Sequence, residues 1–226
     1  MSLHVIILAA GKGSRMKSDT PKVLHPVAGT PMLHRVMSTA KRLAPEQLHL
    51  VLGHGIEAIQ DTLADQWSAT NIVQQAEQLG TGHAVNIALD HLPNDGISLV
   101  LYGDVPLITV DTLEHCVAIA DAGELGIVTA NMSDPAQLGR ILRNDTDAIE
   151  AIVEYKDATQ QQRAIHEINS GILAAPTHLL RHWLSQVQPN NQQGEYYLTD
   201  VVALAVNDGV GVQGIVVDDE NDDSFG

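Results

Sequence analysis

The chain has 226 residues, which suits one domain, or one domain with a small subdomain. Its net charge of −16 argues against binding to nucleic-acid backbones or anionic membranes, and no apolar run approaches the length needed to span a bilayer. Its single cysteine, Cys116, excludes an internal disulfide framework and suits a reducing compartment. Since no secretory signal is visible either, we expect a cytoplasmic protein with Cys116 as a buried thiol.

Short apolar segments alternate with amphipathic ones through the first 135 residues. Apolar runs predict strands at residues 4–9, 48–52, 71–74, 97–102 and 126–130. Helical periodicity predicts helices at residues 31–43, 81–92 and 109–120, the first of them capped by Thr30 with Pro31 in its first turn. The alternation is typical of βαβ units, so the expected fold is α/β, an open, mostly parallel, Rossmann-like sheet flanked by helices.

The pattern changes after about residue 135. Strands separated by polar loops are expected at residues 139–143, 149–154 and 166–174, and they predict a mixed edge of the sheet with a small β lobe. Helices near 176–187 and 197–207 and a last strand at 210–217 follow. We therefore expect a single domain over residues 1–226, made of a nucleotide-binding half at about 1–135 and a second half at about 136–226.

A glycine-rich loop directly follows the first strand. It reads L-A-A-G-K-G-S-R-M over residues 8–16, with P-K at residues 21–22, and it carries the cations Lys12, Arg15 and Lys22. Glycines allow the backbone to approach a ligand closely, and clustered N–H groups and cations form an anion site. The loop matches neither a Walker A motif nor a dinucleotide fingerprint, because Met16 stands where the latter needs glycine. We interpret it as a triphosphate site; the alternative is an ordinary turn with solvated cations.

Two further segments follow predicted strands. Residues 75–82 read Q-A-E-Q-L-G-T-G. They offer amides that can pair with the edge of a base, followed by a helix N-terminus that favours an anion. The alternative is an ordinary helix start that Thr81 caps. Asp104 follows a buried strand, where open sheets bind ligands. A carboxylate beside phosphates indicates Mg²⁺, whereas the alternative is an Asp turn ahead of Pro106.

Later polar residues are less specific. Glu154 and Asn169 can hydrogen-bond sugar hydroxyls, or be surface residues. Thr199 can reach a phosphate, or cap the following helix as Asp200 also can. His178 and His182 lie one helical turn apart but lack the glutamate of H-E-x-x-H, so we expect solvated histidines.

The first motif resembles the signature of the sugar-phosphate nucleotidyltransferases. The order of L-A-A-G-K-G-S-R-M, Q-A-E-Q-L-G-T-G-H-A, L-Y-G-D-V-P-L, G-R-I, I-V-E-Y-K-D-A, E-I-N-S-G-I and G-E-Y-Y-L-T-D is similar to the N-terminal domain of the bacterial GlmU family. Members of that family are bifunctional N-acetylglucosamine-1-phosphate uridylyltransferases and glucosamine-1-phosphate acetyltransferases. The resemblance implies a nucleotide-diphospho-sugar transferase fold. It also implies Mg²⁺-dependent formation of UDP-N-acetylglucosamine and pyrophosphate from UTP and N-acetylglucosamine-1-phosphate, a precursor supply for peptidoglycan and lipopolysaccharide.

The resemblance also implies site residues. The nucleoside would be held by Leu8, Ala9, Ala10 and Gly11, and the uracil read by Gln75, Gly80 and Thr81. The triphosphate and the departing pyrophosphate would be bound by Arg15 and Lys22. The junction would be lined by Tyr102, Gly103 and Asp104, with Asp104 on Mg²⁺. The amino sugar would be held in the second half by Gly139, Glu154 and Asn169. The sugar phosphate is already a nucleophile, so electrostatic stabilisation and positioning replace a general base.

The chain departs from the family at its end. The family's second Mg²⁺ ligand, an Asn beyond a Gly-Val, and its left-handed β-helix acetyltransferase domain, which builds a homotrimer, lie beyond Gly226. We therefore expect an isolated domain or fragment that binds substrates with impaired metal affinity and turnover. Alternatives are a thymidylyl- or cytidylyltransferase, a non-catalytic nucleotide-sugar-binding module, and a dinucleotide-dependent dehydrogenase, against which Met16 counts.

Overall fold

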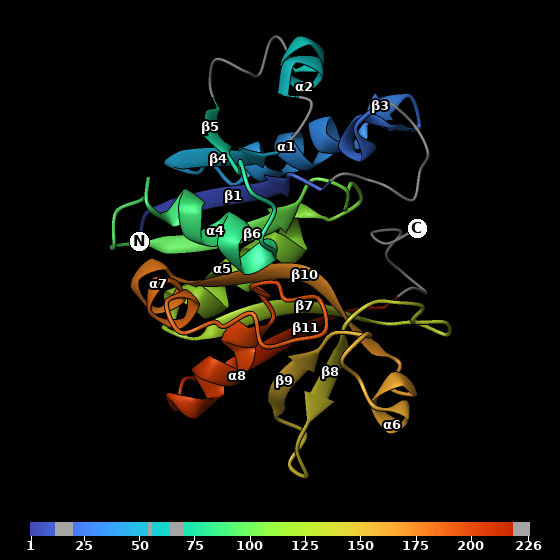
Figure 1. Cartoon of the computed structure of the whole chain (residues 1–226). Helices are drawn as coiled ribbons and strands as arrows, with labels where there is room; N and C mark the ends of the chain where they lie inside the picture. The colour runs from blue at the N-terminus through green and yellow to red at the C-terminus, as the bar shows by residue number, and fades with distance from the viewer. Residues whose placement is uncertain (12–19, 54–55, 64–69, 219–226) are drawn as a thin grey trace.

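A computed structural model describes residues 1–11, 20–53, 56–63 and 70–218, and nine strands of this part form one mixed sheet (Figure 1). The strands of the sheet are β1 (Leu3–Ala9), β4 (Gln47–Leu52), β5 (Asn71–Gln74), β6 (Ile97–Tyr102), β7 (Leu125–Asn131), β8 (Arg140–Arg143), β9 (Ile149–Val153), β10 (Glu167–Pro176) and β11 (Val212–Asp218). Their order across the sheet is β11-β7-β10-β6-β1-β4-β5, and β8 and β9 extend it from β10.

Helices and short elements connect these strands. The helices are α1 (Met32–Arg42), α2 (Ile56–Thr62), α4 (Thr81–Leu89), α5 (Val110–Asp121), α6 (Gln160–Arg163), α7 (Thr177–Leu184) and α8 (Asp200–Asn207). A 3-10 turn, η2 (Lys22–Leu24), precedes a small hairpin of β2 (Pro26–Val27) and β3 (Thr30–Pro31). Within the described part of the chain, no helix is both long and apolar enough to cross a membrane.

The parallel half of the sheet confirms the expected βαβ arrangement. Strand β1 pairs in parallel with β4 and β6, and β4 pairs in parallel with β5. Parallel strands covered on both faces are apolar on both faces. Accordingly Ile6 packs in one core with helix α4, while Ile7 packs in the other core with helices α1 and α5. The carboxyl ends of β1, β4, β5 and β6 therefore meet along one edge, where the predicted site segments begin.

Strand β10 differs in position from the prediction. The sequence predicts the strands after residue 135 at a mixed edge, but β10 lies inside the sheet, antiparallel to both β6 and β7. Its apolar run Ile172–Ala175 is buried, as is typical of a strand inside a sheet that is covered on both faces. The register with β7 shifts between Asn169 and Leu173, and Gly171 lies within that shift with φ +90°. Such a bulge bends a strand and re-aims its side chains.

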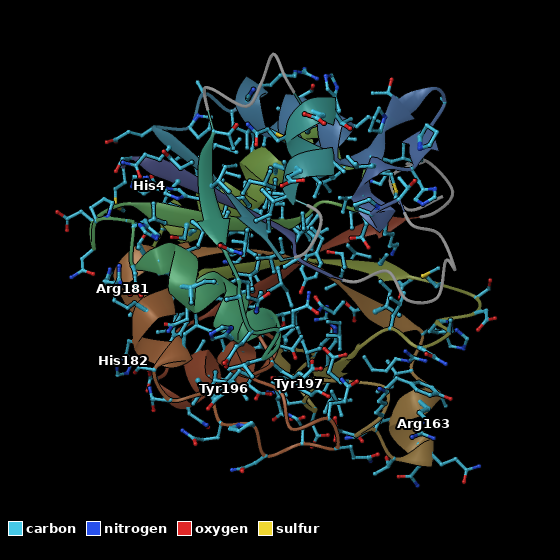
Figure 2. The ribbon with its side chains drawn as sticks, turned by 45° about the horizontal axis from the view of Figure 1, so that its top comes forward. His4, Arg163, Arg181, His182, Tyr196 and Tyr197 are labelled. Atoms are coloured by element: carbon cyan, nitrogen blue, oxygen red, sulfur yellow. The ribbon has the colours of Figure 1, made fainter. Side chains whose placement is uncertain are left out.

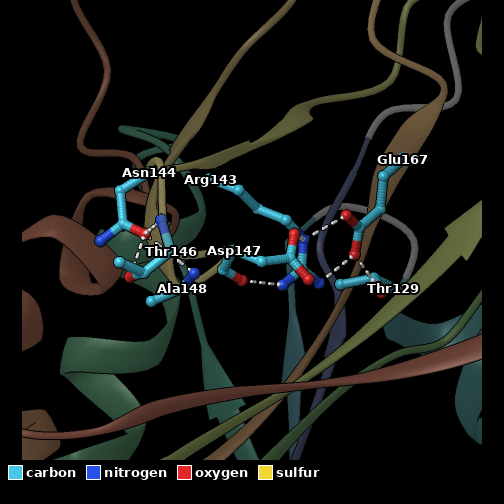
Figure 3. A network of polar contacts seen from close by, with 7 residues as sticks. All are labelled: Thr129, Arg143, Asn144, Thr146, Asp147, Ala148 and Glu167. Carbon is cyan, nitrogen blue, oxygen red and sulfur yellow. Dashed lines mark hydrogen bonds and ion pairs between the residues drawn. The ribbon is translucent and has the colours of Figure 1, made fainter.

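The predicted small lobe is confirmed. Figure 1 shows β8, β9 and α6 projecting together below the main sheet. A bidentate ion pair joins this lobe to β10, because Nε and Nη2 of Arg143 donate to the two carboxylate oxygens of Glu167 at 2.7 and 2.8 Å (Figure 3). Thr129 on β7 donates to the same carboxylate at 2.9 Å. Burial alone would raise the pKa of Glu167, but the hydrogen bonds from Arg143 and Thr129 outweigh it and lower that pKa.

Several local predictions need correction. Thr30 does not cap the first helix: it lies in β3, and the cap position belongs to Pro31, which makes no side-chain cap bond. Helix α4 ends at Leu89 rather than at residue 92. The sequence pattern also missed α2 and α6, since helices this short carry too few turns for a periodicity to be visible. Cys116 is buried as expected, and burial raises the pKa of its thiol to about 12.

The Arg143–Glu167 pair predicts a stability effect that depends on geometry rather than on charge. Arg143→Lys keeps the positive charge but cannot make both hydrogen bonds, so we expect the free energy of unfolding to fall by about 1–3 kcal/mol. Urea denaturation measures it. The control is Arg42→Lys at the exposed end of α1, and equal stability of the two variants would contradict the prediction.

Buried histidines near the amino ends of the strands predict an acid-sensitive fold. His49 on β4 is 2% exposed and its ring stacks on His91, and the buried Nδ1 atoms of His4 and His49 have no hydrogen-bond partner among the described residues. Burial, and then the nearby charges of His91 and His4, lower the pKa of His49 to about 4.

Because the unfolded chain takes up this proton near pH 6.5 and the folded chain only near pH 4, stability falls as the pH drops through that window. We expect a loss of about 2 kcal/mol in the free energy of unfolding between pH 7.5 and pH 5, measured by urea denaturation. His49→Leu should reduce the loss. An unchanged pH dependence in that variant would show that other groups cause it.

Candidate functional site

Two adjoining cavities open at the carboxyl edge of the parallel strands. The first has a volume of about 320 Å³, and its lining includes the expected nucleoside and base positions Leu8, Ala9, Ala10, Gly11, Gln75, Gly80 and Thr81. The second has a volume of about 430 Å³, and its lining includes the expected sugar positions Gly139, Glu154 and Asn169. The two cavities share five residues, Lys22, Thr81, Tyr102, Asp104 and Glu195. Most of the sequence-predicted residues of both halves therefore lie around two adjoining cavities.

An ion pair lies where the cavities meet. Lys22, at the start of η2, donates from Nζ to Oδ2 of Asp104 at 2.5 Å, and Asp104 lies in the turn that follows β6. The two side chains remain 44% and 27% exposed, so both are accessible to a ligand. An ammonium group with further hydrogens to donate and a carboxylate are the groups that a phosphate and a divalent cation need.

The Gln75 amide is held rigidly in the first cavity. Gln75 follows β5, is 4% exposed, and places Nε2 3.1 Å from the carbonyl oxygen of Gly80 and 3.0 Å from Nδ1 of His83. Gln78 reaches across the same cavity and donates to the carbonyl oxygen of Ala10, at the start of the glycine-rich loop. These two amides link the segment between β5 and α4 to the start of α4 and to the residue that follows β1.

Hydrogen bonds join the N-terminus of α4 to the segment that precedes α8. Gly82 N donates to the Tyr196 carbonyl at 2.8 Å, Tyr196 N donates to the Leu79 carbonyl at 2.8 Å, and Leu198 N donates to Oγ1 of Thr81 at 3.0 Å. Figure 2 shows Tyr196 and Tyr197 beside this end of α4. Gly80 has φ +117°, and a Cβ there would lie 2.5 Å from the Tyr196 carbonyl oxygen. Thr81 thus joins two distant segments instead of capping its helix.

Acidic residues line the second cavity. Burial raises the pKa of Glu154, which accepts a hydrogen bond from Thr199 Oγ1 at 3.1 Å, and the charges of Asp157, Asp200 and Glu195 raise it further. Asn169 donates from its backbone N to the carbonyl of Gly139 at 3.0 Å, which fixes these two positions against each other. A carboxylate and an amide held in this way can bind sugar hydroxyls.

Tyr102 forms the wall between the cavities. Burial and the charge of Glu154 raise the pKa of its phenol well above the usual range, so the hydroxyl keeps its proton. Gly171 packs against the ring: a Cβ at this position would lie 2.5 Å from Cε2 of Tyr102. The bulge of β10 therefore supports the residue that divides the site.

Some expected residues lie elsewhere. Gly103 lines neither cavity, and a Cβ there would meet Leu33, Ala9 and Val23 at 3.1–3.3 Å. Thr199 hydrogen-bonds Glu154 and lines a third cavity of about 180 Å³, which shares Glu154 and Tyr197 with the second; its side chain makes no cap bond with α8. Arg15 lies outside the described residues.

The sequence reasoning missed other lining residues. Gln78 and Glu195 both lie inside motifs that the sequence displays, and their polar side chains were the available signal. Arg140, by contrast, is buried and donates to the carbonyls of Ala136 and Leu138, so it holds the loop before Gly139. His178 and His182 are exposed, as expected.

The side chains that could bind a metal ion are few in the described part of the chain. In the parts of the chain that the structure describes, no three His, Cys, Asp or Glu side chains come together as a metal site. Asp104 offers one carboxylate at the junction of the cavities. This fits a cation such as Mg²⁺, which commonly binds through one or two carboxylates together with substrate phosphates and water.

Solved structures share this architecture. The chain superposes on UDP-glucose pyrophosphorylase complexed with UDP-glucose with a TM-score of 0.76 and 16% identity, covering 92% of this chain and 88% of the other. It superposes on a putative glucose-1-phosphate thymidylyltransferase from Bacillus anthracis with a TM-score of 0.74 and 19% identity, covering 96% and 87%. The fold is therefore that of the nucleotidyltransferases that act on sugar phosphates.

The chain belongs to the MobA-like NTP transferase domain family, whose model matches residues 5–191. Among its relatives, the bifunctional protein GlmU of Marinobacter nauticus is 54% identical over 210 residues, and that of Nitrosospira multiformis is 51% identical over 214 residues. Each alignment covers 93% of this chain. The chain spans about half the length of these relatives, 46% and 45% respectively.

The contact between Gly171 and Tyr102 predicts a position-specific cost. Gly171→Ala must accommodate both a left-handed backbone and a collision with the Tyr102 ring, whereas Gly123→Ala, also at φ +90°, meets no atom within 4 Å. We expect Gly171→Ala to lower the free energy of unfolding by about 1–3 kcal/mol more than Gly123→Ala. Urea denaturation of both variants measures the difference, and equal losses would show that the Tyr102 ring yields freely.

Proposed function

We propose that the chain transfers a uridylyl group from UTP to N-acetylglucosamine-1-phosphate, giving UDP-N-acetylglucosamine and pyrophosphate. The proposal is supported by the motif order, by family membership and by the GlmU relatives. One observation carries it. The cavity that holds the Gln75 amide and the cavity lined by Glu154 and Asn169, which can bind sugar hydroxyls, meet at the Lys22–Asp104 pair. That is the arrangement needed to join a nucleotide to a sugar phosphate.

In this proposal the nucleoside occupies the first cavity. The backbone of residues 8–11 approaches the nucleoside, and the segment 75–81 meets the base. Uracil presents an N–H between two carbonyls, and an amide can pair with such an edge. The N-acetylglucosamine moiety occupies the second cavity, where Glu154, Asn169 and the backbone at Gly139 bind its hydroxyl and amide groups.

The proposed reaction is an in-line attack by a phosphate oxygen of the sugar phosphate on the α-phosphorus of UTP. The new P–O bond forms as the bond to the pyrophosphate oxygen breaks, and pyrophosphate leaves with the bonding electron pair. The attacking phosphate is already ionised, so no general base is required. The two substrates repel each other as anions, and Lys22 and Arg15 lower that repulsion and stabilise the charge that grows on the leaving group.

Asp104 is the residue proposed to hold Mg²⁺. An ion held by this carboxylate would supply charge neutralisation beside the phosphates. Asp104 and Lys22 pair with each other in the structure, so both need new partners when the substrates bind. The retained phenol proton of Tyr102 lets its hydroxyl donate a hydrogen bond beside this group.

The wider role follows from the same reaction. We place the chain in the cytoplasm, as a source of activated amino sugar for peptidoglycan and lipopolysaccharide. Assembly into homotrimers would belong to a parent protein of the length of the GlmU relatives.

Pyrophosphate release tests the reaction, with UTP, N-acetylglucosamine-1-phosphate and Mg²⁺, and calorimetry measures UDP-N-acetylglucosamine binding on the same sample. We expect release that requires both substrates, and a fall of about 100-fold or more in kcat for Lys22→Ala and Asp104→Asn. Arg42→Ala, an exposed cation on α1, is the charge control. Absence of both pyrophosphate release and UDP-N-acetylglucosamine binding would overturn the proposal. Binding without release would support the proposed ligand and contradict the proposed catalytic activity.

A further inference from the structure

Both amide hydrogens of Gln75 are used inside the protein. The side chain is 4% exposed and lines the first cavity, and its Nε2 has two acceptors within reach, the carbonyl oxygen of Gly80 at 3.1 Å and Nδ1 of His83 at 3.0 Å. An amide nitrogen carries two hydrogens, so these two contacts account for both. The group of Gln75 that remains for a ligand is the acceptor Oε1.

The two acceptors are themselves held in place. Gly80 precedes α4, and the carbonyl of Leu79 accepts a hydrogen bond from Tyr196 at 2.8 Å. His83 lies in the first turn of α4, next to Gly82, whose N–H donates to the Tyr196 carbonyl. A neutral histidine that accepts at Nδ1 carries its proton on Nε2. One acceptor alone leaves the amide free to turn about that single bond, and the second fixes its plane.

We infer that His83 is a specificity-determining positioning residue: by accepting from Gln75 it holds Oε1 toward the base and makes the site select a base with an N–H donor at N3. The inference rests on the proposed function, in which Gln75 meets the base. Uracil and thymine both carry a hydrogen at N3, whereas N3 of cytosine is an acceptor beside an amino donor. An outward Oε1 pairs with the first edge and repels the ring nitrogen of the second. His83 thus acts against cytosine and does not distinguish uracil from thymine.

Calorimetric titration with UTP and with CTP in the presence of Mg²⁺ tests the inference through the ratio of the two Kd values. His83→Leu removes the acceptor. His83→Asn retains one, because Oδ1 of asparagine is as many bonds from Cβ as Nδ1 of histidine. Asn86→Ala is the matched control, since Asn86 is exposed on the same helix and lines a cavity of about 400 Å³ that His83 also lines.

We expect the preference for UTP over CTP to fall about fivefold or more in His83→Leu, the factor that one hydrogen bond contributes. Asparagine should restore most of it, and Asn86→Ala should leave it unchanged. A merely structural role of His83 would weaken both nucleotides equally, so the ratio would not move. An unchanged ratio in a folded His83→Leu variant, checked by circular dichroism, overturns the inference.

A double-mutant cycle shows whether His83 acts through Gln75. In a Gln75→Ala background, His83→Leu should change the ratio no further, because the group that it positions is gone. Independent, additive effects would contradict the mechanism. The wild-type ratio separates this inference from the proposed function: no preference for UTP removes the base assignment of Gln75 itself, whereas a preference that His83→Leu leaves intact removes only the role of His83.

Discussion

The site depends on the insertion of β10 between β6 and β7. This strand runs antiparallel to both neighbours and brings Asn169 and Gly171 to the carboxyl end of β6, where Tyr102 and Asp104 lie. The bulge at Gly171 is what allows the approach, because any side chain there would occupy the space of the Tyr102 ring. Without this strand the first cavity would lack the residues of β10 that line the second cavity beside it.

A second contact completes the enclosure. The backbone of residues 79–82 hydrogen-bonds the backbone of Tyr196, and the Thr81 side chain accepts a hydrogen bond from Leu198 N, more than 100 positions away in the chain. Backbone-to-backbone bonds hold the two segments closely, so a glycine is required at position 80, where a Cβ would lie 2.5 Å from the Tyr196 carbonyl oxygen, while a Cβ at position 82 would make a tight contact of 3.0 Å with the same oxygen. The same hydrogen bonds hold the start of α4, which carries the Gly80 and His83 acceptors of the Gln75 amide. The position of that amide therefore depends on a segment from the other half of the chain.

Electrostatics explain why an acidic chain is compatible with anionic ligands. Asp104 and Glu195 line both cavities, Glu154 lines the second, and Lys22 is a cation at their junction. A triphosphate would meet mostly repulsion there if it came alone. In the proposed reaction, Mg²⁺ on Asp104 would reverse that balance, and the carboxylates of the second cavity would face the uncharged sugar hydroxyls.

The local sequence determined a great deal about this protein. Apolar runs bounded by glycine and polar residues located the strands of the parallel half within one or two residues, since buried parallel strands have an apolar signature of their own. The loops after β1, β5 and β6 were predicted as site segments from a different rule, because ligands of open α/β sheets bind at the carboxyl ends of strands. The small lobe was also visible as a change in pattern.

Only the tertiary structure decided which distant segments meet. The interior position of β10, the pairing of Lys22 with Asp104, the hydrogen bond of Thr199 to Glu154 and the contact of His83 with Gln75 all depend on strand order and on packing between segments. Periodicity reports which face of an element is apolar, and it carries no information about the neighbour that covers that face. The local sequence therefore determined which residue types lie at the candidate site, and the fold determined which residues each of them contacts.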